Sequence, residues 1–437
     1  MRLAVRNDET GLWDFSDLAD PLPPAKPLPQ RANFIRMESA KYPKAVDIIR
    51  SFVKVTVTLP VKLDGFPRTR KTGHGLVVDA EKGLVAISRA VVPYDLCDIS
   101  ITIADSIIVE GKVVFLHPLQ NYAIIKYDPS LVQAPVKSAV LSTRTINQGE
   151  DTIFFGFNQN YRPVVAKTVV TDITTVAIPS SASTPRYRAT NLDAITVDTN
   201  LANACGSGVL VSEDGTVQAL WLTYLGERNH NNKDIEYHLG LAAPMVLPIV
   251  DQVRQGITPN LRILNVEFQT VHMSQARVMG VDEKWIERVE LEDPERHQLF
   301  MVRKVDSGGD QGLLEGDVLL TLNDKLITRV TDLDIQYYAE ALDAVIVRKK
   351  ELMHVEVSTV PTQDVETDRA VIFCGAVLHR PHHAVRQQIS KIHSDIYISG
   401  RVIIFLPTSF LAKLTFSRCV DLLPLPMGLP RQTLSHM

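Results

Sequence analysis

The residue best suited to covalent chemistry in this 437-residue chain is a cysteine in the segment Asn203-Ala-Cys-Gly-Ser-Gly208. A thiol attacks a carbonyl carbon as the thiolate, and for turnover it needs a base within hydrogen-bond reach and a third group that orients this base. Only a few per cent of an ordinary thiol is ionised near pH 7, so Cys205 alone would be weakly reactive. Its reactivity therefore depends on which residues stand where the base and the orienting group would be.

The segment around Cys205 resembles the nucleophile loop of trypsin-like proteases, Gly-x-Ser-Gly-Ser/Gly-Pro, with cysteine at the nucleophile position. Segment 86–92 resembles their Leu-Thr-x-x-His-Val-Val, and it has Ala90 where the general base would be. Segment 117–126 resembles the one that ends Asp-Leu-Ala-Val-Leu-Lys, and it has Asn121 where the orienting carboxylate would be. Alanine cannot accept a proton, so the resemblance implies a protease scaffold that retains none of its catalytic triad.

Two further observations bear on this chemistry. Asn203 and Gly208 stand where glycine and proline usually bracket the nucleophile loop. His74 and His117 are the histidines closest to these segments, and a Cys–His dyad with one of them is the alternative that would restore an enzyme. A histidine on the surface or in the core is the simpler interpretation of both.

The elements that would carry these positions are short strands. Gly, Asn and Asp clusters such as 79–83 and 212–215 separate β-rich runs over roughly 200 residues, which favours a barrel or sandwich and is compatible with two six-stranded barrels. The runs are 52–59, 75–79, 83–87, 107–115, 152–156 and 209–212.

A helix is predicted to end this region. Residues 245–255 have apolar side chains at helical spacing, with Pro248 tolerable in the first turn and Gly256 as a C-cap. We therefore expect a domain boundary here.

A PDZ-like unit is predicted over residues 259–362. Its most specific part is the segment 312–323, Gly-Leu-Leu-Glu-Gly-Asp-Val-Leu-Leu-Thr-Leu-Asn, which matches the turn and strand of a PDZ domain, where glycine supplies a positive φ. A helix over 330–340 would form one wall of a peptide groove. An ordinary buried hairpin is the alternative for this unit. The loop that captures a terminal carboxylate resembles the segment formed by Val278, Met279, Gly280 and Val281.

Together these motifs resemble the HtrA/DegP family of trypsin-like serine proteases with PDZ domains. Stretches such as 6–15, 92–98, 185–189 and 381–388 are similar to the fungal, nuclear, pro-apoptotic branch of that family. This branch is a tandem repeat, and the chain resembles its carboxy-terminal half. The resemblance implies a mainly β fold, in which a degenerate trypsin-like double β-barrel is followed by PDZ-like α+β domains.

The domain boundaries follow from this resemblance. Residues 1–45 would be the end of the preceding repeat and a proline-rich linker, 46–256 the degenerate protease domain, and 259–362 the PDZ-like domain. Residues 363–437 would be a truncated second PDZ-like module. After Ser399 the expected Gly-Asp turn does not follow, so a truncated gene model and a disordered or aggregation-prone tail over 400–437 are expected.

Composition restricts the partners. The net charge of −4 gives no indication of nucleic acid, and the four cysteines have no metal-ligand spacing, so we expect no metal and no cofactor. No secretory signal or membrane-spanning stretch is evident, which predicts a nuclear or cytoplasmic protein. We expect peptides or unfolded carboxy termini as partners and leave a homo-oligomer open. The alternative function is an active endopeptidase, through Cys205 or an upstream catalytic half.

Overall fold

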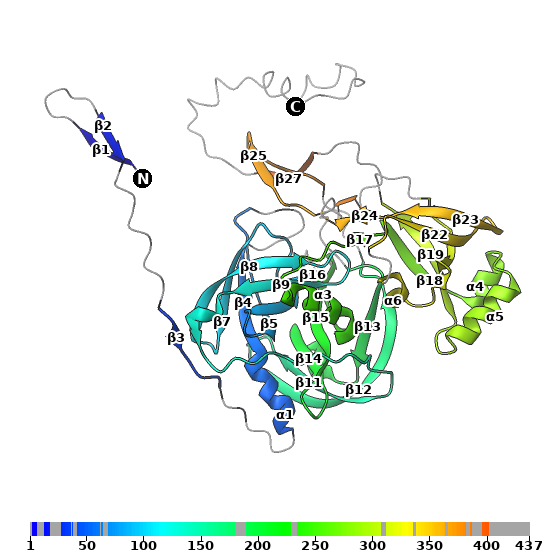
Figure 1. The fold of residues 1–437 in the computed structure, drawn as a ribbon, viewed down its shortest axis with the longest axis horizontal. Coiled ribbons are helices and arrows are strands. Elements are labelled where there is room, and N and C mark those ends of the chain that lie inside the picture. The colour runs from blue at the N-terminus through cyan, green and yellow to red at the C-terminus, as the bar shows by residue number, and fades with distance from the viewer. Residues whose placement is uncertain are drawn as a thin grey trace.

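The computed structural model describes about three-quarters of the chain, and two closed β-barrels form most of the described part (Figure 1). The described residues are 2–6, 13–17, 28–35, 37, 42–61, 63, 69–179, 189–228, 234–306, 312–334, 338–362, 366–381, 385–386 and 396–401.

The first barrel closes in the order β4-β5-β6-β9-β8-β7. Alternate residues of its first strand, Val53, Val55 and Val57, are buried, as the two-residue period of a strand requires. The strands are β4 (Phe52–Thr58), β5 (Arg70–Asp79), β6 (Leu84–Ser88), β7 (Asp98–Ile103), β8 (Ile107–Leu116) and β9 (Tyr122–Tyr127).

The second barrel closes in the order β11-β12-β13-β16-β15-β14. Its strands are β11 (Asp151–Phe157), β12 (Pro163–Val176), β13 (Leu192–Val197), β14 (Ser207–Val211), β15 (Val217–Arg228) and β16 (Asp234–Ala242). The predicted mainly β, double-barrel architecture is confirmed, and strand pairing explains it because each barrel leaves no unpaired sheet edge.

The predicted helix at the end of the barrels is α3 (Ala243–Arg254). It begins two residues earlier than the sequence pattern indicated, so Pro248 lies inside the helix instead of in its first turn. Gly256 follows with φ +78°, a left-handed conformation that glycine adopts without steric cost. The buried face of α3 carries Val246, Ile249 and Val250.

Several short elements precede the barrels or connect their strands. Strand β3 (Gln30–Arg31) pairs in parallel with β10 (Val132–Gln133), which holds the amino-terminal segment against the first barrel. The others are the hairpin β1 (Arg2–Arg6) and β2 (Trp13–Asp17), the helices α1 (Pro43–Val46) and α2 (Asn200–Asn203), and the 3-10 turns η1 (Asp47–Ser51) and η2 (Pro129–Leu131).

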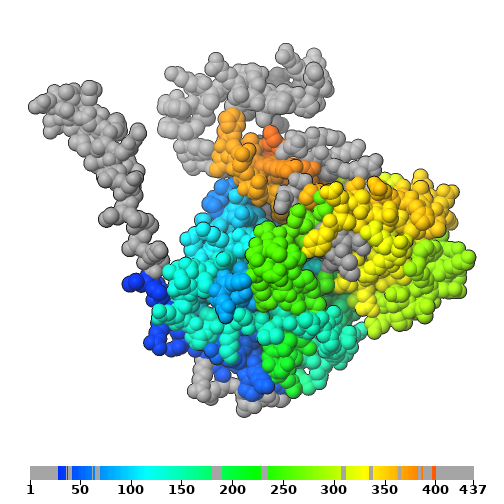
Figure 2. Space-filling model, in the orientation of Figure 1, coloured from blue at the N-terminus to red at the C-terminus, as the bar shows by residue number. Residues whose placement is uncertain are grey.

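The part of the chain predicted to be a PDZ-like unit forms a sheet in the order β18-β19-β20-β22-β23, in which β18 is an edge strand and β21 pairs with β20. It lies beside the second barrel (Figures 1 and 2). Its elements are β17 (Arg262–Ile263), β18 (Val266–His272), α4 (Met273–Val278), α5 (Glu283–Glu292), β19 (Gln298–Val305), β20 (Val318–Leu322), β21 (Lys325–Leu326), α6 (Val330–Asp334), β22 (Ala341–Arg348), β23 (Glu351–Ser358) and β24 (Val360–Pro361).

The Gly-Asp turn that indicated this unit has a clear structural role. Gly316 has φ +92°, and the buried Asp317 accepts a hydrogen bond from Leu314 N at 2.7 Å. Arg348 on β22 donates to both Asp317 carboxylate oxygens, at 2.8 Å and 2.7 Å. The aspartate therefore fixes the turn and joins it to the sheet, because a bidentate guanidinium–carboxylate pair is both strong and directional.

A separate three-stranded sheet, called the third sheet because it follows the barrels and the PDZ-like sheet, is formed by β25 (Ala370–Phe373), β26 (Ala376–His379) and β27 (Tyr397–Arg401). Its buried residue Val377 belongs to the hydrophobic core of the first barrel. Apart from residues 400 and 401, the predicted tail over 400–437 lies outside the described residues, as does most of the predicted proline-rich linker. No helix in the described part of the chain is long and apolar enough to cross a membrane.

Candidate functional site: the degenerate triad and the PDZ-like groove

Cys205 lies in the hydrophobic core of the second barrel. Its side chain is buried in a cluster that includes Phe154, Leu210 and Trp221. Burial raises the pKa of this thiol to about 11, because a thiolate would lose its solvation there. At pH 7 the ionised fraction is then on the order of one in ten thousand. In the part of the chain that the structure describes, Cys205 is a buried free cysteine that forms no disulfide.

The backbone at Cys205 is also engaged. Helix α2 is a single turn capped by Thr199, whose side chain accepts a hydrogen bond from Leu201 N. The chain leaves this turn with Cys205 N–H donating to Ala202 O at 3.0 Å. An oxyanion hole needs backbone N–H groups that point toward the reacting carbonyl. Here the N–H group of the nucleophile position points back into its own turn.

The other two triad positions form a hydrogen-bond bridge between the barrels. The buried Asn121 donates through Nδ2 to Ser88 Oγ at 3.1 Å and to the carbonyl of Thr223 at 2.6 Å. Ser88 Oγ also donates to Thr223 O at 2.8 Å and accepts from Ala90 N at 3.0 Å. The structure thus brings Ala90 and Asn121 together, and it uses them to hold β15 of the second barrel against the first barrel.

Neither histidine singled out from the sequence contacts Cys205. His74 Nδ1 lies 3.4 Å from Ser207 Oγ, and the imidazole stacks on Phe157. Burial, aided by Lys54, lowers the pKa of His74 to about 3. His117 is buried, its Nδ1 accepts from Gln120 N at 2.9 Å, and burial together with Arg89 lowers its pKa to about 3. Both imidazoles are therefore neutral at pH 7 and tied to structural contacts.

Sequence inspection missed a third histidine near the loop. His238 on β16 has Nδ1 3.2 Å from Thr223 Oγ1, and this hydroxyl donates to Gly206 O at 2.6 Å. Burial lowers the pKa of His238. Its partner Thr223 becomes a neighbour only when β15 pairs with β16, so no local sequence signal marks it.

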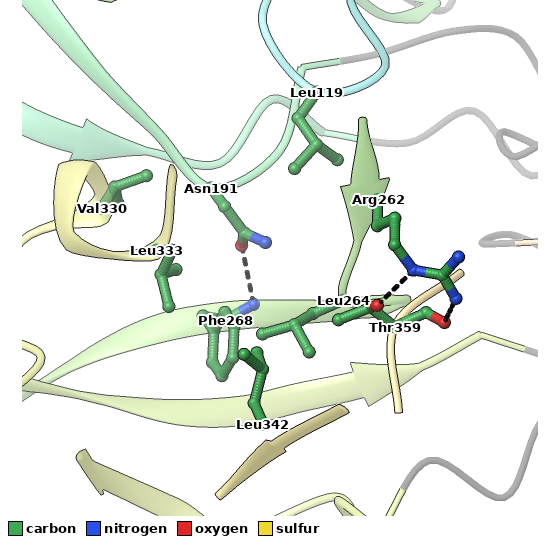
Figure 3. Close-up of a pocket in the computed structure, with 9 residues that line it drawn as sticks. All are labelled: Leu119, Asn191, Arg262, Leu264, Phe268, Val330, Leu333, Leu342 and Thr359. Carbon is green, nitrogen blue, oxygen red and sulfur yellow. Dashed lines mark hydrogen bonds between the residues drawn. The ribbon is translucent and has the colours of Figure 1, made fainter. Parts of the chain in front are cut away.

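A separate groove lies between β18 and α6 of the PDZ-like unit (Figure 3). Phe268 of β18 and Leu333 of α6 form its walls, and Arg262 beside it donates to Thr359 O at 2.9 Å and to Thr359 Oγ1 at 2.8 Å. Two residues of the barrels, Leu119 and Asn191, also line it. The full lining is Leu119, Asn191, Arg262, Leu264, Phe268, Val330, Leu333, Leu342 and Thr359.

The structure places the predicted carboxylate-binding segment at the other end of β22 from this groove. Val278 and Met279 end α4, Gly280 has φ +94°, and Val281 is buried. Gly280 packs so closely on Lys350, in the turn after β22, that an added Cβ would lie 2.6 Å from the Lys350 Cα. The groove instead meets the opposite end of β22, at Leu342. The four residues 278–281 therefore join two helices and are not brought to the groove wall.

Metal-ligating side chains are not gathered in the described segments. Among these residues no group of three or more His, Cys, Asp or Glu side chains could hold a metal ion. Two candidate sites are therefore left. One consists of the buried residues at the predicted triad positions, Ala90, Asn121 and Cys205, and the other is the apolar groove beside the edge strand β18.

The fold is that of an HtrA-type protease. The solved structure of the HtrA-type protease AlgW with a tripeptide superposes with a TM-score of 0.50 over 74% of this chain and 97% of that chain, at 16% identity. No family model matches the sequence.

The sequence is similar to one group of HtrA-like proteases. The chain is a close homologue of the fungal pro-apoptotic serine proteases NMA111, with 69% identity over 403 residues to that of Phaeosphaeria nodorum and 65% over 408 residues to that of Aspergillus niger. Each match covers 92% of this chain and 40% of the relative, so the chain spans less than half the length of these proteins.

Proposed function

We propose that this chain is a non-catalytic, peptide-binding part of an HtrA-like serine protease. The observation that supports a non-catalytic chain is the environment of Cys205. The thiol that a nucleophile would use there is buried among apolar side chains, and the backbone N–H donates to Ala202 O. A base elsewhere would not overcome this arrangement, since the thiol has no solvent-facing approach.

The triad remnant supports the same proposal. Asn121 acts as a hydrogen-bond donor toward Thr223 O, whereas an orienting carboxylate would have to accept from an imidazole. With Ala90 in the base position, Ala90 and Asn121 serve the junction of the barrels through Ser88. The alternative, catalysis through Cys205 and a histidine, has no geometric support, because His74 and His117 bond to other partners.

The edge strand β18 supports peptide binding. An extended peptide adds to a free sheet edge through main-chain hydrogen bonds, and apolar pockets select its side chains. Phe268, Val330 and Leu333 provide such a pocket beside that edge. The segment at Leu264 and Asn265, just before β18 begins, and the guanidinium of Arg262 are the groups that would take a terminal carboxylate. We therefore move the proposed binding site from residues 278–281 to this groove.

We also propose that the chain has a role in regulating proteolysis. They are named serine proteases, and AlgW, an HtrA-type protease, was solved with a tripeptide. In a longer protein of this kind, residues 46–362 would hold peptides or unfolded carboxy termini for a separate catalytic unit. A nuclear site of action is part of this proposal.

The test is a pair of assays on the full chain. Fluorescence anisotropy would follow a fluorescein-labelled, Gly/Ser-rich decapeptide ending in Val-Val, with a free carboxylate or a carboxamide. We expect the acid to bind more tightly than the amide, and Leu333→Arg to weaken binding. The control Leu291→Arg changes an exposed leucine of α5 and should have no effect.

Peptidase activity is measured in the same preparation. We expect no cleavage of unfolded casein by the purified chain. Casein cleavage that Cys205→Ala abolishes would contradict the non-catalytic assignment. Equal binding of acid and amide would contradict carboxylate recognition.

A further inference from the structure

The side chain of Asn191 occupies the free edge of β18. Its Nδ2 donates to Val266 O at 3.0 Å. Its Oδ1 accepts from Phe268 N at 2.9 Å (Figure 3). These two backbone groups, two residues apart on an edge strand, are those that an incoming strand would pair with. One side-chain amide therefore reproduces the donor and the acceptor of a peptide main chain.

The groove is closed in this arrangement. Leu119 reaches it from the loop that carries Asn121, and it is buried there. The space that remains is about 10 Å³, which is barely the minimum that one water molecule needs, whereas ligand pockets span roughly 300–1,000 Å³. No peptide side chain can enter while Leu119 and Asn191 stay in place.

The segment that presents Asn191 is held in a specific geometry. Asn191 has φ +53°, a left-handed conformation that non-glycine residues adopt rarely and asparagine tolerates best. Two residues later, Asp193 accepts from Arg296 of the PDZ-like unit at 3.1 Å and from Thr175 of β12 at 2.8 Å. Asp193 and Arg296 are both largely buried, at 12% and 15% exposure. The turn is thus fixed from both sides with the amide facing β18.

We infer that residues 189–193 are an intramolecular latch, and that a peptide reaches the groove only by displacing Asn191 from β18. The inference rests on the proposed peptide-binding function and states how access of the peptide to the groove is controlled. The competing ligand is an extended peptide with an apolar, free carboxy terminus. Because the groove binds only in its open form, the apparent dissociation constant exceeds the intrinsic one by the inverse of the open fraction.

The test uses Asn191→Gly in the full chain, because glycine keeps the positive φ and removes the amide. Anisotropy of the Val-Val decapeptide with a free carboxylate gives the affinity. We expect Asn191→Gly to bind about tenfold more tightly than the wild type, since two hydrogen bonds that compete with the peptide are gone. Asn191→Asp places a carboxylate oxygen against Val266 O, so it should also bind the decapeptide more tightly than the wild type. Asn160→Gly, in an exposed loop, is the control.

A second readout is hydrogen exchange of the Phe268 amide, which Asn191 protects in the wild type. Asn191→Gly should speed this exchange, and the decapeptide should restore protection. If wild type and Asn191→Gly bind the decapeptide with equal affinity, the latch is wrong and peptide binding stands. If neither Asn191→Gly nor Asn191→Asp binds it, both the latch and the proposed function are wrong.

Discussion

Arg89 and Glu366 form a bidentate ion pair between the first barrel and the segment that leads into the third sheet. The guanidinium donates to the two carboxylate oxygens at 2.8 Å and 3.1 Å. Arg89 is 2% exposed, and it also donates to the carbonyls of His117 and Pro93 at 2.9 Å and 2.7 Å. A buried guanidinium so close to position 90 must keep its partners, because an uncompensated buried charge is costly.

Removing the carboxylate should therefore destabilise the fold. We expect Glu366→Ala to lower the free energy of unfolding by about 2 kcal/mol, less than for a fully buried pair because Glu366 is 24% exposed. Urea denaturation followed by circular dichroism measures the change. Glu150→Ala is the matched control, since Glu150 pairs with Arg144 in similar bidentate geometry at the surface. Equal stability of Glu366→Ala and wild type would refute a structural role for the pair.

Thiol labelling tests the burial of Cys205. Iodoacetamide at pH 8 followed by mass mapping should modify the exposed Cys374 within minutes. Cys205 and Cys97 should react only after denaturation, because burial raises the pKa of Cys205 to about 11 and, with Asp95 and Asp98, that of Cys97 to about 12. Labelling of native Cys205 at the rate of Cys374 would mean that the loop opens to solvent.

Acid should destabilise the protein through its buried histidines. The pKa of His117 is about 3 in the folded state against 6.5 ordinarily, so between pH 6.5 and 3 the unfolded state binds more protons. Stability therefore rises with pH in this window and falls on acidification. Each such histidine contributes up to ~1.4 kcal/mol per pH unit.

His117→Asn isolates this effect. An asparagine side chain can still accept from the N–H groups two and three residues on, but it does not titrate. The free energy of unfolding is measured at pH 6 and at pH 5. We expect it to decrease less between these two pH values in His117→Asn than in the wild type. His354→Asn, at an exposed position of β23, should keep the wild-type loss. An unchanged loss in His117→Asn would show that His117 is solvated in the native state.

The sequence predicted what depends on local pattern. Alternating strands such as β4 and the Gly-Asp turn at Asp317 are local, and both are present as expected. The groove residues Leu119 and Asn191 could not be found this way. They lie about 150 and 75 residues from their neighbours on β18, and only the docking of the PDZ-like unit on the barrels brings them together.

The triad positions illustrate the same limit. Residues 90, 121 and 205 were located by their flanking patterns, and the structure brings the first two together at Ser88. The inward direction of the Cys205 side chain follows instead from the single turn of α2 and the packing around Trp221. No spacing in the sequence encodes which way that side chain points.

Restoring the triad side chains should not restore activity. The combined variant Ala90→His, Asn121→Asp and Cys205→Ser still has a buried position 205 whose N–H is bonded to Ala202 O. It also places an Asp carboxylate against Thr223 O, where Asn121 now donates at 2.6 Å, which should cost about 2 kcal/mol of stability. Triad residues act together with their oxyanion site, so side chains alone are insufficient. Casein turnover by this variant, absent when position 205 carries alanine, would show that the loop can adopt a catalytic shape.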